Sequence, residues 1–397
     1  MTPQPAPLPP PAAPRPSRGA LFTTFLILGA TAFGGPAMVA YIRRVVVTRK
    51  RWLDEAAFED GVALVQALPG ATAMQCAAYV GLRARGPLGA AAAFVGFGLP
   101  SFLIMFALSA LYARGADLPP VLAAFAGLRV IIVALVAYAA FAFARTTLRG
   151  PLDGALALAA AVAFFLGVHP ALVIFPAAAL AGVVMRGGGA ASKAPSKPGR
   201  PYWRAITWTA AVALAGAAAL FIFRRPLFDL TLLMWRVDVL AFGGGYGALP
   251  LLFHEVVRVR GWLDAATFMD GVALGQVTPG PIYITAAFVG YMAQGPVGAA
   301  VAAVAVFLIS FLLVLAAAPY FDRLRAKPWF ERALRGILCS FVGLLASTAV
   351  RFGMEVPWDL PRVLLAVGAA TALLYRVDIV WVVLVGAALS AFAFGRG

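Results

Sequence analysis

Apolar stretches of about 20 residues, separated by short polar segments, follow one another along almost the whole chain. The hydrocarbon core of a bilayer is about 30 Å thick and needs around 20 apolar residues per helix, so each stretch predicts a membrane helix. The thirteen predicted segments lie at 19–40, 61–81, 87–112, 120–145, 151–168, 170–186, 205–223, 229–250, 270–291, 296–319, 333–352, 361–375 and 378–395.

Two polar stretches divide this pattern. Residues 1–18 contain eight prolines and predict a disordered tail, because proline breaks helices and little apolar surface is present. Residues 187–204 are rich in Gly, Pro and Lys and predict a linker. We therefore expect four parts, which are the tail 1–18, a membrane unit 19–186, a basic linker with one connecting helix 187–228, and a second membrane unit 229–397.

The two membrane units are copies of one another. FGGPAM from Phe33 recurs as FGGGYG from Phe242, and RWLDEAAFEDGVALVQALPG from Arg51 recurs as GWLDAATFMDGVALGQVTPG from Gly261. The offset stays at 209 or 210 residues, and Ser101 aligns with Ser310. The expected fold is an all-α polytopic membrane protein with two homologous six-segment halves, joined by one extra helix and containing broken helices.

The orientation of the halves depends on the segments 61–81 and 270–291, each of which carries a Pro-Gly in its middle. If both segments span the bilayer, six spans plus one extra helix give inverted repeats. If both are re-entrant, the halves are parallel. The distribution of basic loop residues fits both arrangements, so the sequence leaves the choice open.

Composition excludes a soluble protein. Of the 397 residues, 62% are hydrophobic and 12% charged, where soluble domains carry about 25% charged residues. The net charge of +16 resides mostly in the loops, where membrane insertion favours Lys and Arg, so we expect lipid rather than nucleic acid as the partner. Two Cys and two His cannot form a Cys/His metal site, and we expect no disulfide, metal or cofactor. No catalytic motif is present, which argues against an enzyme.

The residues that interrupt the apolar helices are the strongest candidates for a substrate site. Broken helices are tolerated at membrane depth only where protein or a water-filled cavity satisfies the freed N–H and C=O groups. Restarted helices also expose N–H donors that suit an anion, with Pro36 and Pro281 placed to begin them. A purely packing role is the alternative. The candidates are Phe33, Gly34, Gly35, Pro36, Pro69, Gly70, Phe242, Gly243, Gly244, Gly245, Pro279 and Gly280.

Polar side chains near these breaks extend the candidate list. Gln66 and Gln276 occupy repeat-equivalent positions and could bind an oxyanion or fasten two helices. The ionisable residues inside the spans are Arg129, Arg236 and Asp238. Placing a charge there costs free energy, so each of these residues is a candidate for a functional role. Arg236 and Asp238 are two residues apart and face different sides of a helix, so they cannot pair. Snorkelling or an ion pair to a neighbouring helix is the alternative role for Arg236.

Four aspartates are also paired by the repeat. Asp54 and Asp264 are expected to cap helix N-termini. Asp60 and Asp270 precede a glycine and the broken segment, and a cap is again the favoured interpretation. Together with Asp238, they are the candidates for proton coupling.

These motifs resemble the chromate ion transporter family in its long, two-domain form. The resemblance is carried by FGG, a basic stretch, WLD, a phenylalanine and an Asp-Gly-x-Ala segment leading to PG, all occurring twice. It implies a protein of the bacterial plasma membrane that exports chromate and confers resistance, with oppositely oriented halves. The halves differ from one another, since Leu68-Pro69-Gly70-Ala71 corresponds to Thr278-Pro279-Gly280-Pro281 and GGP corresponds to GGG.

Elementary energetics agree with export. Moving a dianion out of an inside-negative cell releases about 2.3 kcal/mol per charge per 100 mV. We therefore expect alternating access at a midplane site, with a permease for sulfate or another oxyanion, or an anion channel, as the alternatives. A homodimer is a further expectation.

Overall fold

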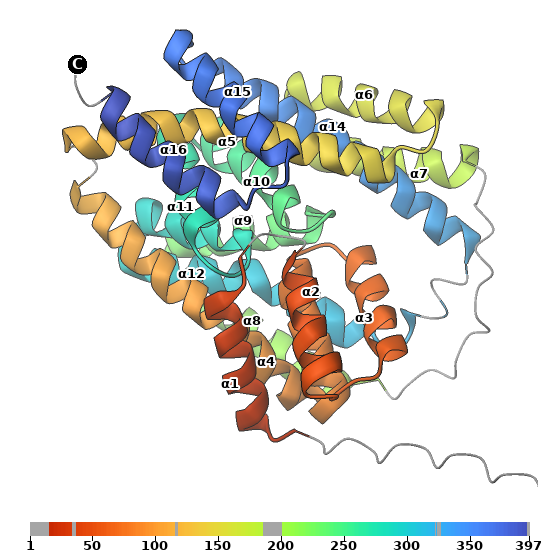
Figure 1. Ribbon diagram of the computed structural model, residues 1–397. Coiled ribbons are helices and arrows are strands. Elements are labelled where there is room, and N and C mark those ends of the chain that lie inside the picture. The colour runs from red at the N-terminus through yellow and green to blue at the C-terminus, as the bar shows by residue number, and fades with distance from the viewer. Residues whose placement is uncertain are drawn as a thin grey trace, which may run out of the picture.

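The computed structural model describes residues 16–33, 37–115, 118–185, 201–321, 323 and 327–394, and every regular element among them is helical (Figure 1). Five helices in this part of the chain are long and apolar enough to cross a bilayer. This agrees with a multi-pass membrane protein of the all-α class, while the number of spans stays a prediction. The five are α4 (Thr72–Gly115), α5 (Pro119–Thr147), α8 (Trp203–Phe223), α12 (Thr285–Ala317, extended by the 3₁₀ turn Ile282–Ile284) and α14 (Pro328–Met354).

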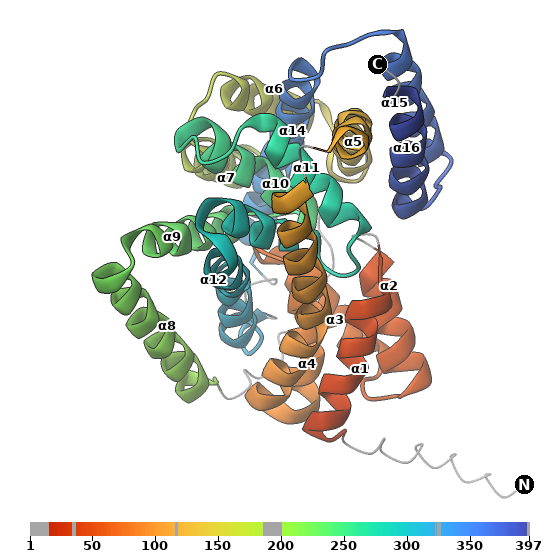
Figure 2. The ribbon, with the colours of Figure 1, turned by 90° about the vertical axis from the view of Figure 1, so that its left-hand side faces the viewer.

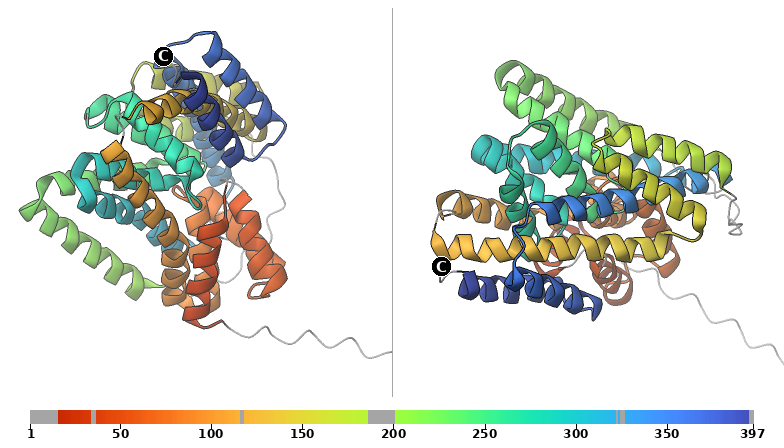
Figure 3. Two further views of the ribbon diagram at one scale, coloured as in Figure 1. Left: turned by 60° about the vertical axis from the view of Figure 1, so that its left-hand side comes forward. Right: turned by 90° about the horizontal axis from the view of Figure 1, so that it is seen from above.

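The helices of the second half follow those of the first in the same order. α8 has no counterpart and lies at the outside of the molecule (Figures 2 and 3). The pairs are α1 (Arg18–Thr31) with α9 (Arg225–Leu240), α2 (Ala37–Arg43) with α10 (Gly245–Phe253), α3 (Glu55–Ala67) with α11 (Ala265–Val277), α4 with α12, α5 with α14, α6 (Pro151–Phe165) with α15 (Leu360–Leu374), and α7 (Pro170–Val184) with α16 (Ile379–Phe394). The π-helical turns Arg44–Arg49 and His254–Val259 extend α2 and α10.

Each Pro-Gly segment forms the tip of a helical hairpin. The first Pro-Gly hairpin consists of α3, the tip 68–71 and the first arm of α4 (72–84). Its arms lie side by side, because the Tyr79 hydroxyl donates a hydrogen bond to the Ala57 carbonyl (3.2 Å) and a Cβ added to Gly61 would lie 2.2 Å from the Tyr79 ring. The 13 residues of α3 extend about 20 Å, which is too short to cross a bilayer.

The second Pro-Gly hairpin is built in the same way from α11, the tip 278–281 with the 3₁₀ turn, and the first arm of α12 (285–293). A Cβ on Gly271 of α11 would lie 2.2 Å from the Phe288 ring in this arm. The hairpin tips are therefore the breaks that the sequence singles out, with helical arms leading towards and away from each one.

Both long helices bend sharply after their first arm. The kinks are at Arg85–Gly86 in α4 and Gln294–Gly295 in α12, where both glycines have positive φ. Across the first kink the chain doubles back, and a Cβ on Gly81 would lie 2.2 Å from the Gly89 carbonyl oxygen. Each hairpin is thus followed by a second arm, 87–115 in α4 and 296–317 in α12, that passes back along it.

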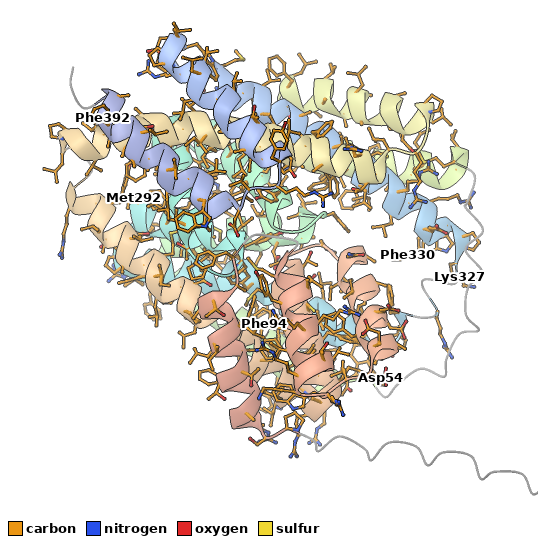
Figure 4. All side chains as sticks on the ribbon, in the orientation of Figure 1. Asp54, Phe94, Met292, Lys327, Phe330 and Phe392 are labelled. Carbon is orange, nitrogen blue, oxygen red and sulfur yellow. The ribbon has the colours of Figure 1, made fainter. Side chains whose placement is uncertain are left out.

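α1 and α2 approach and leave the centre of the molecule alongside these elements. The Arg85 guanidinium donates to the Pro16 carbonyl at the outer end of α1 (2.7 Å), and α1 then follows the second arm of α4. α2 leads back outwards, where Arg43 forms an ion pair with Glu55 at the start of α3 (2.5 Å). Asp54 caps α3 at this outer end, remote from the tip (Figure 4).

The second arms of α4 and α12 pack against each other and run antiparallel. Phe94, near the beginning of the α4 arm, lies against Phe311 near the end of the α12 arm (ring centroids 5.1 Å apart). Phe106, towards the end of the α4 arm, lies against Tyr291 (5.6 Å), which precedes the kink from which the α12 arm starts, so the beginning of each arm faces the end of the other. The hairpins of the two halves consequently reach the centre from opposite ends of the molecule.

The two halves are interleaved in space. α5 packs against α15 and α16, whereas α14 packs against α6 and α7 (Figure 2). Close backbone approaches fix these contacts, since a Cβ on Gly127 would meet the Ser390 hydroxyl and a Cβ on Gly336 would meet the Ala177 carbonyl. Asp153 of α6 accepts a hydrogen bond from Arg335 of α14 (2.5 Å). The consecutive units of the sequence therefore exchange their peripheral helices.

Candidate functional site

The tip of the first Pro-Gly hairpin docks on the second half. The Gly70 amide donates to the Ala241 carbonyl (2.7 Å), directly before the FGGG break. The Ala71 amide donates to the Ser310 hydroxyl (3.0 Å), which lies in the second arm of α12. Both contacts use backbone N–H groups that a helix start leaves without an internal partner.

The tip of the second hairpin docks on the first half in the equivalent way. The Gly280 amide donates to the Ala32 carbonyl (2.8 Å), and a Cβ on Gly280 would lie 1.8 Å from the Ser101 hydroxyl oxygen. Ala32 and Ser101 are the repeat equivalents of Ala241 and Ser310. Each hairpin tip therefore completes the broken region of the opposite half.

Glycine is required at both tips for two separate reasons. Gly70 has φ of +112° and Gly280 has φ of +96°, which L-residues rarely adopt. In addition, a Cβ on Gly70 would lie 2.0 Å from the Ser310 hydroxyl oxygen, so no side chain fits there.

Three helix starts converge between the tips. A Cβ on Gly244, just before α10, would lie 3.1 Å from Thr72 Oγ1 at the start of α4. A Cβ on Gly245 would lie 3.3 Å from Ile282, which opens the 3₁₀ turn before α12. Gly243 and Gly244 both have positive φ (+79° and +80°). Helix N-termini carry partial positive charge, so this point favours an anion.

The other predicted residues of the breaks differ in their surroundings. Gly34, Gly35 and Pro36 lie outside the described residues. Phe33 is partly buried, and Phe242 packs edge-on against Phe341 of α14 (6.2 Å). Pro69 accepts a hydrogen bond at its carbonyl from Gln75 (2.6 Å), while Pro279 is buried beside its glycine.

Asp238 lies at the first tip contact and is fully buried. Its carboxylate accepts hydrogen bonds from the Ser310 amide and the Ser310 hydroxyl, both at 2.7 Å. Ser310 thus links the carboxylate to the hairpin tip through the Ala71 amide. The repeat equivalent of Asp238 is Gly29, so this carboxylate belongs to one half only.

Arg129 and Asp270 form a bidentate ion pair, the Arg129–Asp270 clamp, away from the tips. Arg129 Nε and Nη2 donate to the two Asp270 oxygens at 2.7 and 2.8 Å, and the Tyr112 hydroxyl donates to Asp270 at 2.8 Å. Asp270 is 1% exposed, and the pair joins α11 of the second half to α4 and α5 of the first. The positions equivalent to Arg129 and Tyr112 are Leu338 and Phe321, so these described positions give the first hairpin no equivalent ion pair.

The interpretation of Asp60 and Asp270 as helix caps is wrong. Both helices begin earlier, at residues capped by Asp54 and Asp264, whose carboxylates each accept a backbone N–H at 2.7 Å. Asp60 and Asp270 therefore lie inside α3 and α11, where a capping role is geometrically excluded. The predicted caps at Asp54 and Asp264 are confirmed.

Arg236 and Asp238 point to different sides of α9, as predicted. Arg236 is half exposed and lies 3.7 Å from Glu255, so its charge pairs with a neighbouring helix rather than entering the breaks. The two glutamines also differ, because Gln66 is exposed whereas Gln276 is buried and its Nε2 has no hydrogen-bond partner among the described residues.

Sequence reasoning missed three polar residues at the tips. Ser101, Ser310 and Gln75 are all fully buried, and the Ser101 hydroxyl has no hydrogen-bond partner in the described part of the chain. The available signal was a serine at repeat-equivalent positions in the middle of two apolar helices. Gln75 carried a similar signal, since an amide in an apolar helix needs a partner.

A groove of the described structure lies away from the tips. It has a volume of about 500 Å³ and is lined almost entirely by apolar side chains of α5, α15 and α16, among them Ile131, Leu365 and Trp381. An apolar groove cannot compensate the dehydration of a small dianion. The convergence of the two tips is therefore the better candidate site.

Comparison with known proteins places relatives of the chain among transporters. No solved structure matches the chain. An uncharacterized transporter of Methanocaldococcus jannaschii is 40% identical over 94% of both chains. The chromate transport protein of Pseudomonas aeruginosa is 34% identical over 83% of this chain and 80% of its own length, and a probable chromate transport protein of Synechococcus elongatus is 32% identical over 86% of each. The family model described as "Chromate transporter" matches twice, at residues 19–183 and 228–391, so both interleaved halves, and with them the whole chain, belong to the chromate transporter family.

Proposed function

We propose that this protein exports chromate from the bacterial cytoplasm across the inner membrane, by alternating access around the point where the two hairpin tips meet. The observation that carries the proposal is the crossed docking of each Pro-Gly tip on the broken helix of the opposite half. Such docking makes one site from both repeats, which is how repeat-built secondary transporters form theirs. The names of the relatives support chromate as the substrate.

We further propose that the halves have inverted topology. Two observations support this proposal, namely the antiparallel second arms of α4 and α12 and the entry of the hairpins from opposite ends. Ser101 lies about halfway along the arm 87–115, so the tips meet near the bilayer midplane if that arm crosses the membrane. On this basis the Pro-Gly segments are re-entrant hairpins, and the broken segments formed by α1–α2 and α9–α10 reverse in the same way. Two of the six predicted crossings are then lost from each half rather than one, so α8 still places the second half in the opposite orientation.

The oxyanion would be held by neutral donors. The helix starts at Thr72, Gly245 and Ile282 supply N–H groups and partial positive charge, and Ser101 supplies a hydroxyl that has no other partner among the described residues. The two arginines are not free in this arrangement, since Arg129 pairs with Asp270 and Arg236 lies near Glu255. Neutral donors bind a dianion without trapping it, which suits a transporter that must release its substrate.

The membrane potential favours export. Movement of a dianion out of an inside-negative cell releases about 4–5 kcal/mol of free energy per 100 mV, which is enough to drive efflux without another energy source. Resistance to chromate would follow from this flux.

The proposal is tested by measuring chromate uptake into everted vesicles. We expect Gly244→Leu to abolish uptake, because a side chain there meets Thr72 at the converging helix starts and requires a strained φ. Gly295→Leu is the matched control, because Gly295 also has positive φ (+64°) and no described atom lies within 4 Å of a Cβ at that position. Equal uptake by the two variants at equal protein level would show that the site is elsewhere.

Transport of sulfate is the second candidate function. The donors at the tips recognise oxygen atoms and charge, and nothing among the described residues distinguishes one tetrahedral dianion from another. Competition between labelled sulfate and chromate in the same vesicles separates the two substrates. Saturation and counter-transport would exclude an anion channel.

A further inference from the structure

We propose that Asp238 binds a proton that crosses the membrane together with the oxyanion. This inference rests on the proposed transport function and adds a coupling ion to it. It starts from a carboxylate that is 0% exposed, located at the docking point of the first hairpin tip.

Asp238 lacks a charge partner. Among the described residues no Lys, Arg or His nitrogen lies within 4.0 Å of its carboxylate, and both hydrogen bonds that it accepts come from Ser310, a neutral residue. A buried carboxylate without a cation is strongly disfavoured in its charged form, so it must acquire a proton or another cation during the cycle.

The groups around Asp238 offer no alternative source of charge. α12, which packs against α9, contains no Asp, Glu, Lys or Arg. On α9 itself, Arg236 is directed to Glu255 and Arg225 to Asp229. α8 contains one arginine, Arg204, in its first turn. Among the described residues, the buried phenol of Tyr283 lies close by, with its hydroxyl 3.4 Å from the Ala241 carbonyl, and α10, which also packs against α9, contributes the buried phenol of Tyr246. Neither phenol supplies a positive charge.

The position of Asp238 couples its protonation to binding of the oxyanion. The Ser310 hydroxyl that donates to Asp238 also accepts the Ala71 amide at the hairpin tip, next to Thr72 and the converging helix starts. A negative carboxylate at this point repels a dianion, whereas a neutral one does not. Binding of the oxyanion therefore favours the protonated form, and by linkage the proton favours binding of the oxyanion.

With a coupled proton, the membrane potential and the proton gradient both act on the transport step. With one proton per dianion the complex carries one net negative charge, which still moves outwards down the membrane potential. An inward proton gradient opposes the same step. Because Gly29 replaces Asp238 in the first half, one such proton site exists per chain among the described residues.

Purified protein in liposomes loaded with a pH-sensitive dye tests the inference. Chromate is added on one side within the alkaline range, where it stays a dianion. We expect the wild-type protein to carry about one proton per chromate, and its chromate exchange to fall as pH rises. Proton movement absent from a wild-type protein that transports chromate would overturn the inference and leave the proposed function intact. Absence of chromate transport would refute both.

Two variants assign the proton to Asp238. Asp238→Asn retains an oxygen for the Ser310 amide and an N–H₂ for the Ser310 hydroxyl, so it imitates the protonated carboxyl. We expect its proton movement to disappear and its pH profile to become flat. Asp229→Asn removes a carboxylate from the exposed part of the same helix and should keep both properties. Proton coupling that persists in Asp238→Asn would overturn the assignment.

Discussion

Replacement of Gly280 by alanine tests whether docking of a hairpin tip is required for transport. Two effects oppose alanine there. The φ of +96° is strained for an L-residue, at about 1–3 kcal/mol, and the new methyl group would lie 1.8 Å from the Ser101 hydroxyl oxygen. Relief of such an overlap typically costs a further 1–3 kcal/mol, roughly, because the hydroxyl and the tip must separate.

Gly295→Ala separates these two effects. Gly295 also has positive φ (+64°), but no atom of the described residues lies within 4 Å of a Cβ at that position. Both variants therefore carry backbone strain, and only Gly280→Ala disturbs the docked tip. The additional 1–3 kcal/mol corresponds to about 5- to 150-fold fewer docked molecules.

The assay is chromate uptake into everted vesicles at matched protein level, with thermal unfolding in detergent as the measure of stability. We expect Gly295→Ala to lose stability with transport close to wild type, and Gly280→Ala to lose transport in addition. The double variant Gly280→Ala/Ser101→Ala should recover part of it, because removal of the hydroxyl leaves a contact at 3.0 Å. If Gly280→Ala transports as well as Gly295→Ala, tip docking is not part of the cycle.

Three further predictions concern the clamp, the caps and the topology. Arg129→Leu leaves the Asp270 carboxylate buried without its ion-pair partner and should lower the free energy of unfolding by about 3–5 kcal/mol. The double variant Arg129→Leu/Asp270→Leu should restore most of this free energy. Equal melting temperatures for the single and the double variant would contradict the prediction. Asp54→Ala and Asp264→Ala each remove a cap and should cost about 1 kcal/mol in thermal unfolding, and no change in either would refute the capping role. Arg49→Cys and Val259→Cys place thiols at exposed repeat-equivalent positions, while the native Cys76 and Cys339 are buried. The two new thiols should react with a membrane-impermeant reagent from opposite sides of the membrane. Labelling of both from the same side would exclude inversion.

Local features of the chain account for the parts of the fold that could be predicted. The apolar stretches, the repeat offset and the caps at Asp54 and Asp264 are properties of contiguous residues, and helix formation depends on them directly. The error at Asp60 and Asp270 has the same origin. The apolar pattern places the starts of these segments at residues 61 and 270, whereas α3 and α11 begin at Glu55 and Ala265, six and five positions earlier, directly after their caps.

The site itself required the tertiary structure. Asp238 and Ser310 are 72 positions apart, Arg129 and Asp270 are 141 apart, and Ala71 and Ser310 are 239 apart. Hydropathy indicates that a residue is buried but not which partner it contacts. Repeat symmetry does not supply the partner either, because Asp238 faces a hairpin tip whereas its repeat equivalent Gly29 packs against a backbone carbonyl.

The sequence by itself determined that this is a helical membrane protein made from two copies of one unit, with glycine and proline breaks at matching places, because length, apolarity and local repetition suffice for those conclusions. Only the tertiary structure decided that the copies exchange helices and that each Pro-Gly tip completes the other copy. Both depend on contacts between distant residues, which are selected by packing in three dimensions rather than by any pattern along the chain.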